Sequence, residues 1–229
     1  MANITECIQY EYIDKLSILL SNVQCNNRYP DFLFQAISFV KPRATEVIFK
    51  YCGKQLENSM DQYNNSAVKA VIYSYKDAKP QQKQNALSVL EVVAKHSNDI
   101  NIKDEYGDTP LMTAAYLGLD EAISVLLRYG ADYSIIDASG NNALDKALWE
   151  GHKIAVVAFF QHNSSLKDAP VLSKGQTPLT KTLYGKKTEM VEFLLKQNVS
   201  KEAQNQDGMT PNDIAKEMGV DLQSIDSHL

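Results

Sequence analysis

The sequence predicts an all-α protein built from a repeated pair of helices, and three observations support this fold class. Glycine recurs at positions 107, 140, 175 and 208, at intervals of 33, 35 and 33 residues. Three of these glycines are followed, two residues later, by the dipeptide Thr-Pro. Behind each glycine, apolar residues recur at the three- and four-residue spacing of an amphipathic helix. A fixed period of this length is typical of a stack of similar units.

The segment from Gly107 to Gly118 shows what each position of the repeat does. Gly107 is expected at the tip of a turn, in a backbone conformation that other side chains resist. Thr109 is suited to accept a hydrogen bond from a free amide at the start of a helix. Pro110 at the first helical position loses no hydrogen bond within the helix. Gly118 is then expected to end this first helix.

A second helix is predicted from Asp120 to Tyr129, before the closing segment Gly130-Ala131-Asp132. Its apolar residues have helical spacing and would face the first helix; they are Ala122, Ile123, Leu126 and Leu127. One repeat therefore consists of a turn, a helix, a tight loop, a second helix and an exit loop.

Residues 104–118 resemble the ankyrin consensus, residues 126–132 resemble its second half, and residues 207–216 resemble a terminal ankyrin repeat. The resemblance is strong over residues 99–219 and moderate over 1–98. The chain departs from the family at the His that usually follows Thr-Pro-Leu, so the hydrogen bond of that His is not carried over. The residues in its place are Met112, Asp145, Thr180 and Asp213.

The resemblance implies an ankyrin-repeat solenoid: helix-turn-helix pairs joined by β-turn or hairpin loops, about six pairs and a short C-terminal cap. We expect one domain over residues 1–229. Its approximate repeats are 1–25, 30–57, 61–101, 104–136, 137–170, 172–204 and 205–229. A polar outer face is expected on the last one, from Lys216, Glu217, Asp221, Gln223 and Asp226.

The N-terminal half follows the same order of elements with weaker motifs. Its expected helices are 4–10, 13–21, 31–39, 44–51, 66–75 and one that begins near 89. A polar insertion near 76–84 carries a helix-breaking proline, and we expect it at the surface.

Composition excludes several classes of function. The hydrophobic fraction is 44%. The net charge is −5, and the sequence lacks the basic stripe that nucleic-acid binding needs. No apolar run approaches the roughly 20 residues of a membrane helix, and the first residues do not resemble a signal peptide. Cys7, Cys25 and Cys52 lack metal-type spacing and are expected to be free thiols. We therefore expect an intracellular, cytoplasmic or nuclear protein that is monomeric alone.

A search for catalytic motifs predicts no enzyme, no cofactor and no metal site. No nucleophile elbow, phosphate loop or kinase motif is present. His152 follows Gly151, a pair that ankyrin repeats commonly use for structure. His96 and His162 are expected near the ends of helices, where a partial positive charge is favourable.

The repeats place an aromatic residue at one equivalent position, seven residues after each capping residue. We call this set the aromatic register: Tyr73, Tyr116, Trp149 and Tyr184. In the ankyrin fold this position faces the concave groove, which favours a partner-binding surface. The alternative is that the four rings pack between neighbouring helices and fill the core.

Turn-tip residues beside the register are further partner-binding candidates: Glu105, Tyr106, Asp108, Ser139, Asn141, Lys174 and Gln176. Glu105, Asp108 and Glu150 make the middle of the array acidic. Lys174, Lys181, Lys186 and Lys187 make the later repeat basic. A partner with a basic and an acidic segment would fit, although charges on a repeat array usually serve only solvation.

Three functional hypotheses follow. The first is a non-catalytic scaffold or adaptor that binds a partner protein in the groove. The second is an assembly chaperone or inhibitor that masks one surface of a larger complex. The third is a bacterial effector that mimics host ankyrin proteins, which would place the chain in the host cytosol.

Overall fold

The computed structural model describes residues 3–22, 29–53, 56 and 59–227, and this part of the chain folds into helices joined by turns. The helices form two compact units. Unit 1 comprises Met1–Asp104 with Arg128–Ala131, and unit 2 comprises Glu105–Leu127 with Asp132–Leu229. The division of the chain into seven repeats of one domain stays a prediction.

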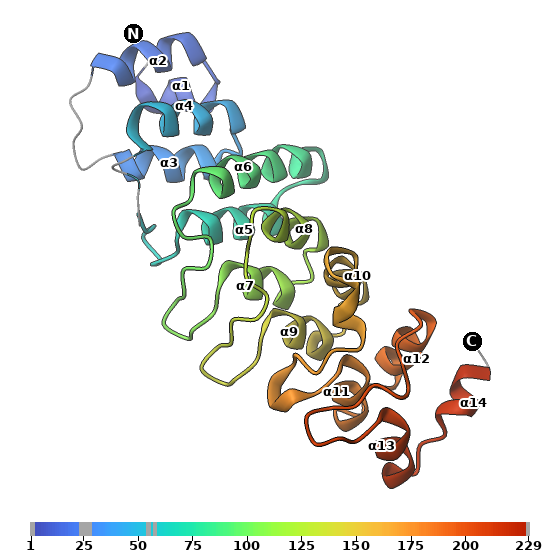
Figure 1. Cartoon of the computed structure of the whole chain (residues 1–229). Coiled ribbons are helices and arrows are strands. Elements are labelled where there is room, and N and C mark those ends of the chain that lie inside the picture. Colours follow the sequence, from blue (N-terminus) through green and yellow to red (C-terminus); the bar gives the residue numbers. More distant parts are fainter. Residues whose placement is uncertain (1–2, 23–28, 54–55, 57–58, 228–229) are drawn as a thin grey trace. The chain divides into compact units, whose positions relative to one another are not determined.

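Unit 1 consists of three helix pairs, whose first and second helices form two layers that can be followed in Figure 1. The first helices, α1, α3 and α5, pack in order on one another, and the second helices, α2, α4 and α6, do the same. Their bounds are α1 Ile4–Gln9, α2 Ile13–Asn22, α3 Tyr29–Ser38, α4 Pro42–Cys52, α5 Ala67–Asp77 and α6 Lys83–His96. Leu16, Ile48 and Leu90 are wholly buried between the layers, so apolar burial holds this stack together.

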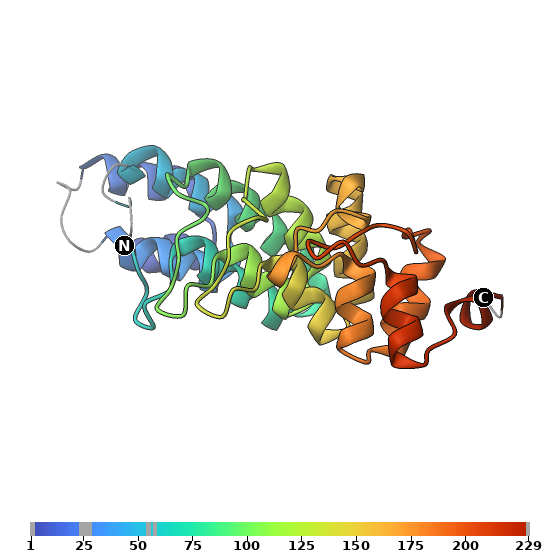
Figure 2. The same cartoon turned by 60° about the horizontal axis from the view of Figure 1, so that its bottom comes forward.

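Unit 2 continues the same alternation with longer turns before the first helices (Figures 1 and 2). Helices α7, α9, α11 and α13 pack in order on one another. The bounds are α7 Pro110–Tyr116, α8 Asp120–Arg128, α9 Ala143–Glu150, α10 Lys153–His162, α11 Pro178–Tyr184, α12 Thr188–Lys196, α13 Pro211–Met218 and α14 Leu222–Ser227. Leu111, Ile123, Phe159 and Leu194 are buried in its core.

The helix starts and turn tips have the predicted local chemistry. Thr109 accepts a hydrogen bond from the amide of Met112, and Pro110 is the first residue of α7. Gly107 and Gly118 have φ of 81° and 69°, a range that glycine adopts without steric cost. In unit 1, Asn64 has φ of 60° two residues before the capping residue Ser66, where the repeats of unit 2 have glycine.

His152 closes the end of α7 from the next repeat, so its structural interpretation is confirmed. Its Nε2 lies 2.9 Å from the carbonyl oxygen of Tyr116, to which it donates. A Cβ added to Gly118 would lie only 2.6 Å from Nδ1 of His152. The imidazole therefore needs glycine at position 118.

The insertion near 76–84 lies at the surface, as expected, but is shorter than predicted. Helix α5 continues to Asp77, and α6 already begins at Lys83. Only a short 3₁₀ turn, Pro80–Gln82, interrupts them. The Lys83 ammonium bonds to the carbonyl oxygen of Tyr75, which ties the start of α6 to the end of α5.

Two of the three cysteines, Cys7 and Cys52, are buried, and Cys7 is a free thiol as expected. Cys25 lies outside the described residues. The predicted polar face of the last pair is exposed at Lys216, Glu217, Asp221 and Gln223, whereas the side chain of Asp226 is outside the described set.

Asp145 takes the place of the missing His and forms a buried polar centre in unit 2. Only 1% of Asp145 is exposed. Its Oδ2 accepts from the amides of Asn142 at 3.0 Å and Ser173 at 2.9 Å. Lys181 Nζ lies 2.9 Å from its Oδ1. Thus α9 is bonded to the turn and first helix of the following pair.

We predict that Asp145→Ala destabilises unit 2 by about 2–4 kcal/mol, because it removes the charged partner of the Lys181 ammonium and the acceptor of two backbone amides. Urea unfolding followed by circular dichroism measures this loss. The matched control is Asp213→Ala, because Asp213 also follows its capping residue by three positions but is exposed. This change should lower the free energy of unfolding by less. Equal losses for the two variants would show that the cross-repeat contacts of Asp145 add nothing.

Candidate functional site

The four residues of the aromatic register lie at the surface. Their exposed fractions are 38% for Tyr73, 54% for Tyr116, 58% for Trp149 and 44% for Tyr184. Tyr73 belongs to unit 1, near the end of α5. The other three lie at or next to the last residues of α7, α9 and α11, three helices that pack in succession in unit 2.

Trp149 is held by a cation from the following repeat. Nζ of Lys187, which precedes α12, lies 4.7 Å from the centroid of the indole ring. This distance is within the range of a cation–π interaction. The contact leaves more than half of Trp149 accessible to solvent. The indole ring therefore packs against Lys187 and still exposes most of its surface.

Tyr184 has one polar contact, from its hydroxyl to Sδ of Met209 at 3.9 Å. A sulfur acceptor at this distance is weak. The Tyr184 hydroxyl is therefore only weakly engaged by Met209.

The turn-tip candidates differ in how far their charges are already compensated. Glu105, Tyr106, Glu150 and Lys174 are exposed, and Lys174 has φ of 58°. Asn141 is half-buried, and its amide donates to Asp137 at 2.9 Å, so it serves the turn.

Asp108 is also a structural residue, because its carboxylate faces Lys146. Nζ of Lys146 lies 2.9 Å from Asp108 Oδ1 and 2.8 Å from Asp137 Oδ2. Lys146 thus joins two consecutive turns of unit 2. The acidic character expected of the middle of the array is reduced accordingly.

The Lys146 cluster shifts two pKa values. Burial alone would raise the pKa of Asp137, but hydrogen bonds from Lys146 and from the amides of Asn141 and Ser139 hold it below its usual value. Burial would lower the pKa of Lys146, but its bonds to Asp137 and Asp108 keep it above its usual value. Both charged forms are therefore stabilised by folding.

A hollow of about 320 Å³ adjoins the register at the C-terminal end of unit 2. Apolar walls come from α11, α12, α13 and α14, and two lysines stand on its polar side. Its lining residues are Thr182, Leu183, Lys186, Lys187, Thr188, Val191, Met218, Val220 and Ile225. Sequence reasoning missed this site, because its walls come from two helix pairs.

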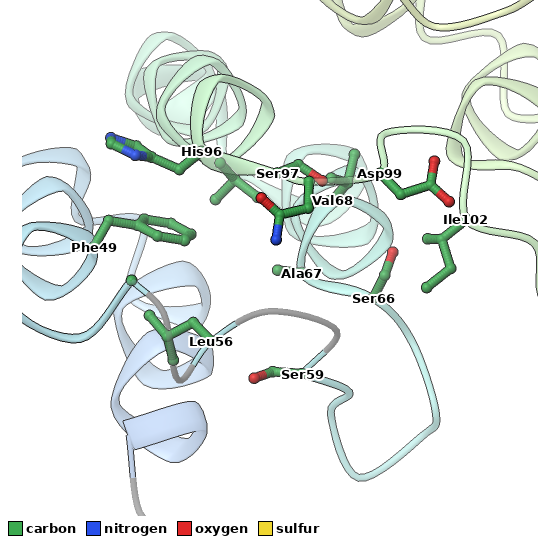
Figure 3. Close-up of a pocket in the computed structure, with 13 residues that line it drawn as sticks. Phe49, Leu56, Ser59, Ser66, Ala67, Val68, His96, Ser97, Asp99 and Ile102 are labelled. Carbon is green, nitrogen blue, oxygen red and sulfur yellow. The ribbon is translucent and has the colours of Figure 1, made fainter. Parts of the chain in front are cut away.

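A second hollow, in unit 1, is too small for a ligand. Its volume is about 40 Å³, room for one or two waters. Figure 3 shows Phe49 and His96 from α4 and α6 on one side and Ser66 and Asp99 on the other. The His96 and Phe49 rings stack at 4.8 Å, and His96 Nε2 lies 3.4 Å from Glu46, so this side is closed by packing.

The two histidines expected near helix ends, His96 and His162, are the last residues of α6 and α10. His162 contacts the ring of Tyr133 edge-on, and His228 lies outside the described residues. Within residues 3–22, 29–53, 56 and 59–227, no group of three or more His, Cys, Asp or Glu could hold a metal ion. The helices among these residues are all too short or too polar to cross a membrane.

We predict that Lys146→Met lowers stability by on the order of 1–2 kcal/mol near neutral pH, since it removes the ion pairs with Asp108 and Asp137. The Asp137 pKa is lower in the folded state, so its contribution is present above pH 3.8 and is lost as pH falls further. The Lys146 contribution is present below pH 10.5 and is lost as pH rises through the raised pKa.

The difference between wild type and Lys146→Met should therefore be largest between about pH 5 and 9 and shrink below pH 4. Urea denaturation at a series of pH values measures it. Lys196→Met, on the exposed end of α12, is the control. A pH-independent difference would contradict the ion-pair assignment.

Comparisons with known proteins indicate the same helical repeat architecture. Residues 78–169 match the family model "Ankyrin repeats (3 copies)". A palmitoyltransferase of Lachancea kluyveri is 34% identical over 130 residues, which are 56% of this chain and 18% of that protein. A potassium channel of Arabidopsis thaliana is 27% identical over 128 residues, which are 56% of this chain and 16% of the channel. The chain thus spans less than a fifth of either relative.

Among solved structures, the crystal structure of an ankyrin repeat protein superposes with a TM-score of 0.60 at 16% identity. The match covers 89% of this chain and 97% of the other. This likeness confirms the predicted all-α fold class. Residues 78–169 therefore carry ankyrin repeats, and the chain has the ankyrin-repeat fold.

Proposed function

We propose that this chain is a non-catalytic scaffold that binds a partner protein through Tyr116, Trp149 and Tyr184 on unit 2. The observation that carries the proposal is their exposure at equivalent positions of three successive first helices. Tyrosine and tryptophan combine a large apolar surface with a polar tip, and they dominate the binding energy of many interfaces. Ankyrin repeats are in general protein-interaction modules, which supports this class of function.

The neighbouring exposed residues give the proposed surface a polar rim. Glu105 and Tyr106 belong to the turn before α7, Glu150 ends α9, and Lys174 lies in the turn before α11. An apolar centre with a polar rim is the usual anatomy of an interface. Tyr73 presents the equivalent side chain on unit 1.

We predict that the triple variant Tyr116→Ala, Trp149→Ala, Tyr184→Ala loses its partner and keeps its fold. The three side chains are 44–58% exposed, and exposed positions usually change stability little. Affinity purification with mass spectrometry should recover a partner with the wild type and not with the variant. The helical signal and the melting temperature should stay nearly unchanged.

Ile154→Ala is the matched control, because it removes an exposed apolar side chain of α10 in the same unit. It should retain the partner. A large fall in melting temperature for the triple variant would assign the rings to the core. Retention of the same partner by the triple variant would overturn the proposed surface. A stoichiometric partner found only in assembly intermediates would instead favour the chaperone function.

A further inference from the structure

The loop between α11 and α12 has an unusual residue at its left-handed position. Nine residues after the capping residue, the other helix pairs of unit 2 have Gly118, Gly151 and Gly219, with φ of 69°, 81° and 70°. The α11–α12 loop has Lys186 there instead, with φ of 52°. A lysine resists this conformation, because its Cβ crowds the backbone.

A glycine stands next to this position without relieving it. Gly185 has φ of −73°, an ordinary helical value. The loop is nevertheless fixed, because the amides of Lys186 and Lys187 donate to the carbonyl oxygens of Leu183 at 2.9 Å and Thr182 at 3.0 Å. Strain of this kind is often retained at functional positions.

The strained Lys186 is one of the residues that line the hollow at the C-terminal end of unit 2. Lys186 and Lys187 line its polar side, whereas Leu183, Val191 and Ile225 form apolar walls. At about 320 Å³ the hollow is at the small end of ligand pockets. It suits one large apolar side chain.

The charged side chains that line this hollow are both lysines. Within the described residues, neither Lys186 nor Lys187 forms an ion pair, and Lys187 instead lies over the ring of Trp149. Of the nearby carboxylates, Glu189 lies 3.7 Å from Lys153. Asp221 accepts from the amides of Gln223 and Ser224, so it caps α14.

We propose that this site binds an acidic peptide segment of the partner that carries one large apolar side chain. The apolar side chain enters the hollow, and flanking carboxylates pair with Lys186 and Lys187. The exposed face of Trp149 packs against the backbone of the bound peptide. This inference rests on the proposed partner-binding function and names the chemistry of the partner.

The test uses the full chain and short synthetic peptides. The probe is a fluorescein-labelled glutamate-rich peptide with one central phenylalanine, and its binding is followed by anisotropy. Trp149 is the only tryptophan, so its emission reports the same event with unlabelled peptide. We expect saturable binding that weakens with salt, and weaker binding when phenylalanine is replaced by alanine or glutamate by lysine.

The decisive variant is Lys186→Gly, which introduces the residue that the other helix pairs of unit 2 have at this position. It should weaken peptide binding by about fivefold, the effect of one exposed ion pair, while its melting temperature rises or stays unchanged. Lys187→Gln should weaken binding and also change the emission of Trp149 in the free protein.

Two controls match these changes. Asn198→Gly relieves another positive φ, 56°, without removing a charge. Lys196→Gln removes an exposed lysine of the same unit that does not line the hollow. Both should bind the acidic peptide as the wild type does.

No binding of the acidic peptide, or equal binding of the lysine-rich one, would overturn the inference. So would unchanged affinity in Lys186→Gly. Binding of sodium laurate without binding of the peptide would assign the hollow to a small acidic amphiphile and reject the peptide proposal. The proposed function is tested separately, by whether the triple aromatic variant loses the partner protein.

Discussion

The buried carboxylate of Asp145 is the interaction on which the order of unit 2 most depends. In a stack of repeats each helix pair contacts only its neighbours, so register must be set at every junction. Asp145 sets it between α9 and α11 through the Ser173 amide and the Lys181 ammonium. Apolar packing alone is non-directional, whereas this carboxylate accepts only from donors in fixed positions.

Other junctions achieve the same result with different chemistry. Lys146 lies between Asp108 and Asp137 of two successive turns. In unit 1, Lys69 pairs with Asp104. Lys69 lies three residues after its capping residue Ser66, as Asp145 lies three residues after Asn142. The position where the family usually has His therefore carries different chemistry from repeat to repeat: an ammonium at Lys69, a buried thioether at Met112, a carboxylate at Asp145 and a hydroxyl at Thr180.

The sequence predicted the local features well, because capping and left-handed turns depend on a few adjacent residues. Thr109 and Pro110 start α7 as expected, and the helix from Asp120 ends at Arg128, one residue before the predicted end. The weaker N-terminal motifs have a physical reason. Asn64 takes the positive φ that glycine takes elsewhere, and asparagine tolerates that conformation, so the turn is present without its glycine.

The contacts between repeats were beyond sequence reasoning. Nothing in the spacing shows that Lys146 pairs with Asp137 of a turn, or that Lys181 pairs with Asp145 of α9. Nor does it show that Lys187 lies over the ring of Trp149. These contacts depend on how one pair packs on the next. The unusual position of Lys186 can be recognised from the sequence, because the residue nine positions after the cap is glycine in all other pairs of unit 2.

The contact between Gly118 and His152 constrains how this chain can change over generations. Any side chain at 118 would collide with the imidazole, whereas loss of the imidazole leaves the Tyr116 carbonyl without its donor. The two positions are thus energetically coupled. Homologous chains should vary at both sites together, and a designer who grafts α7 onto another array must carry the histidine with it.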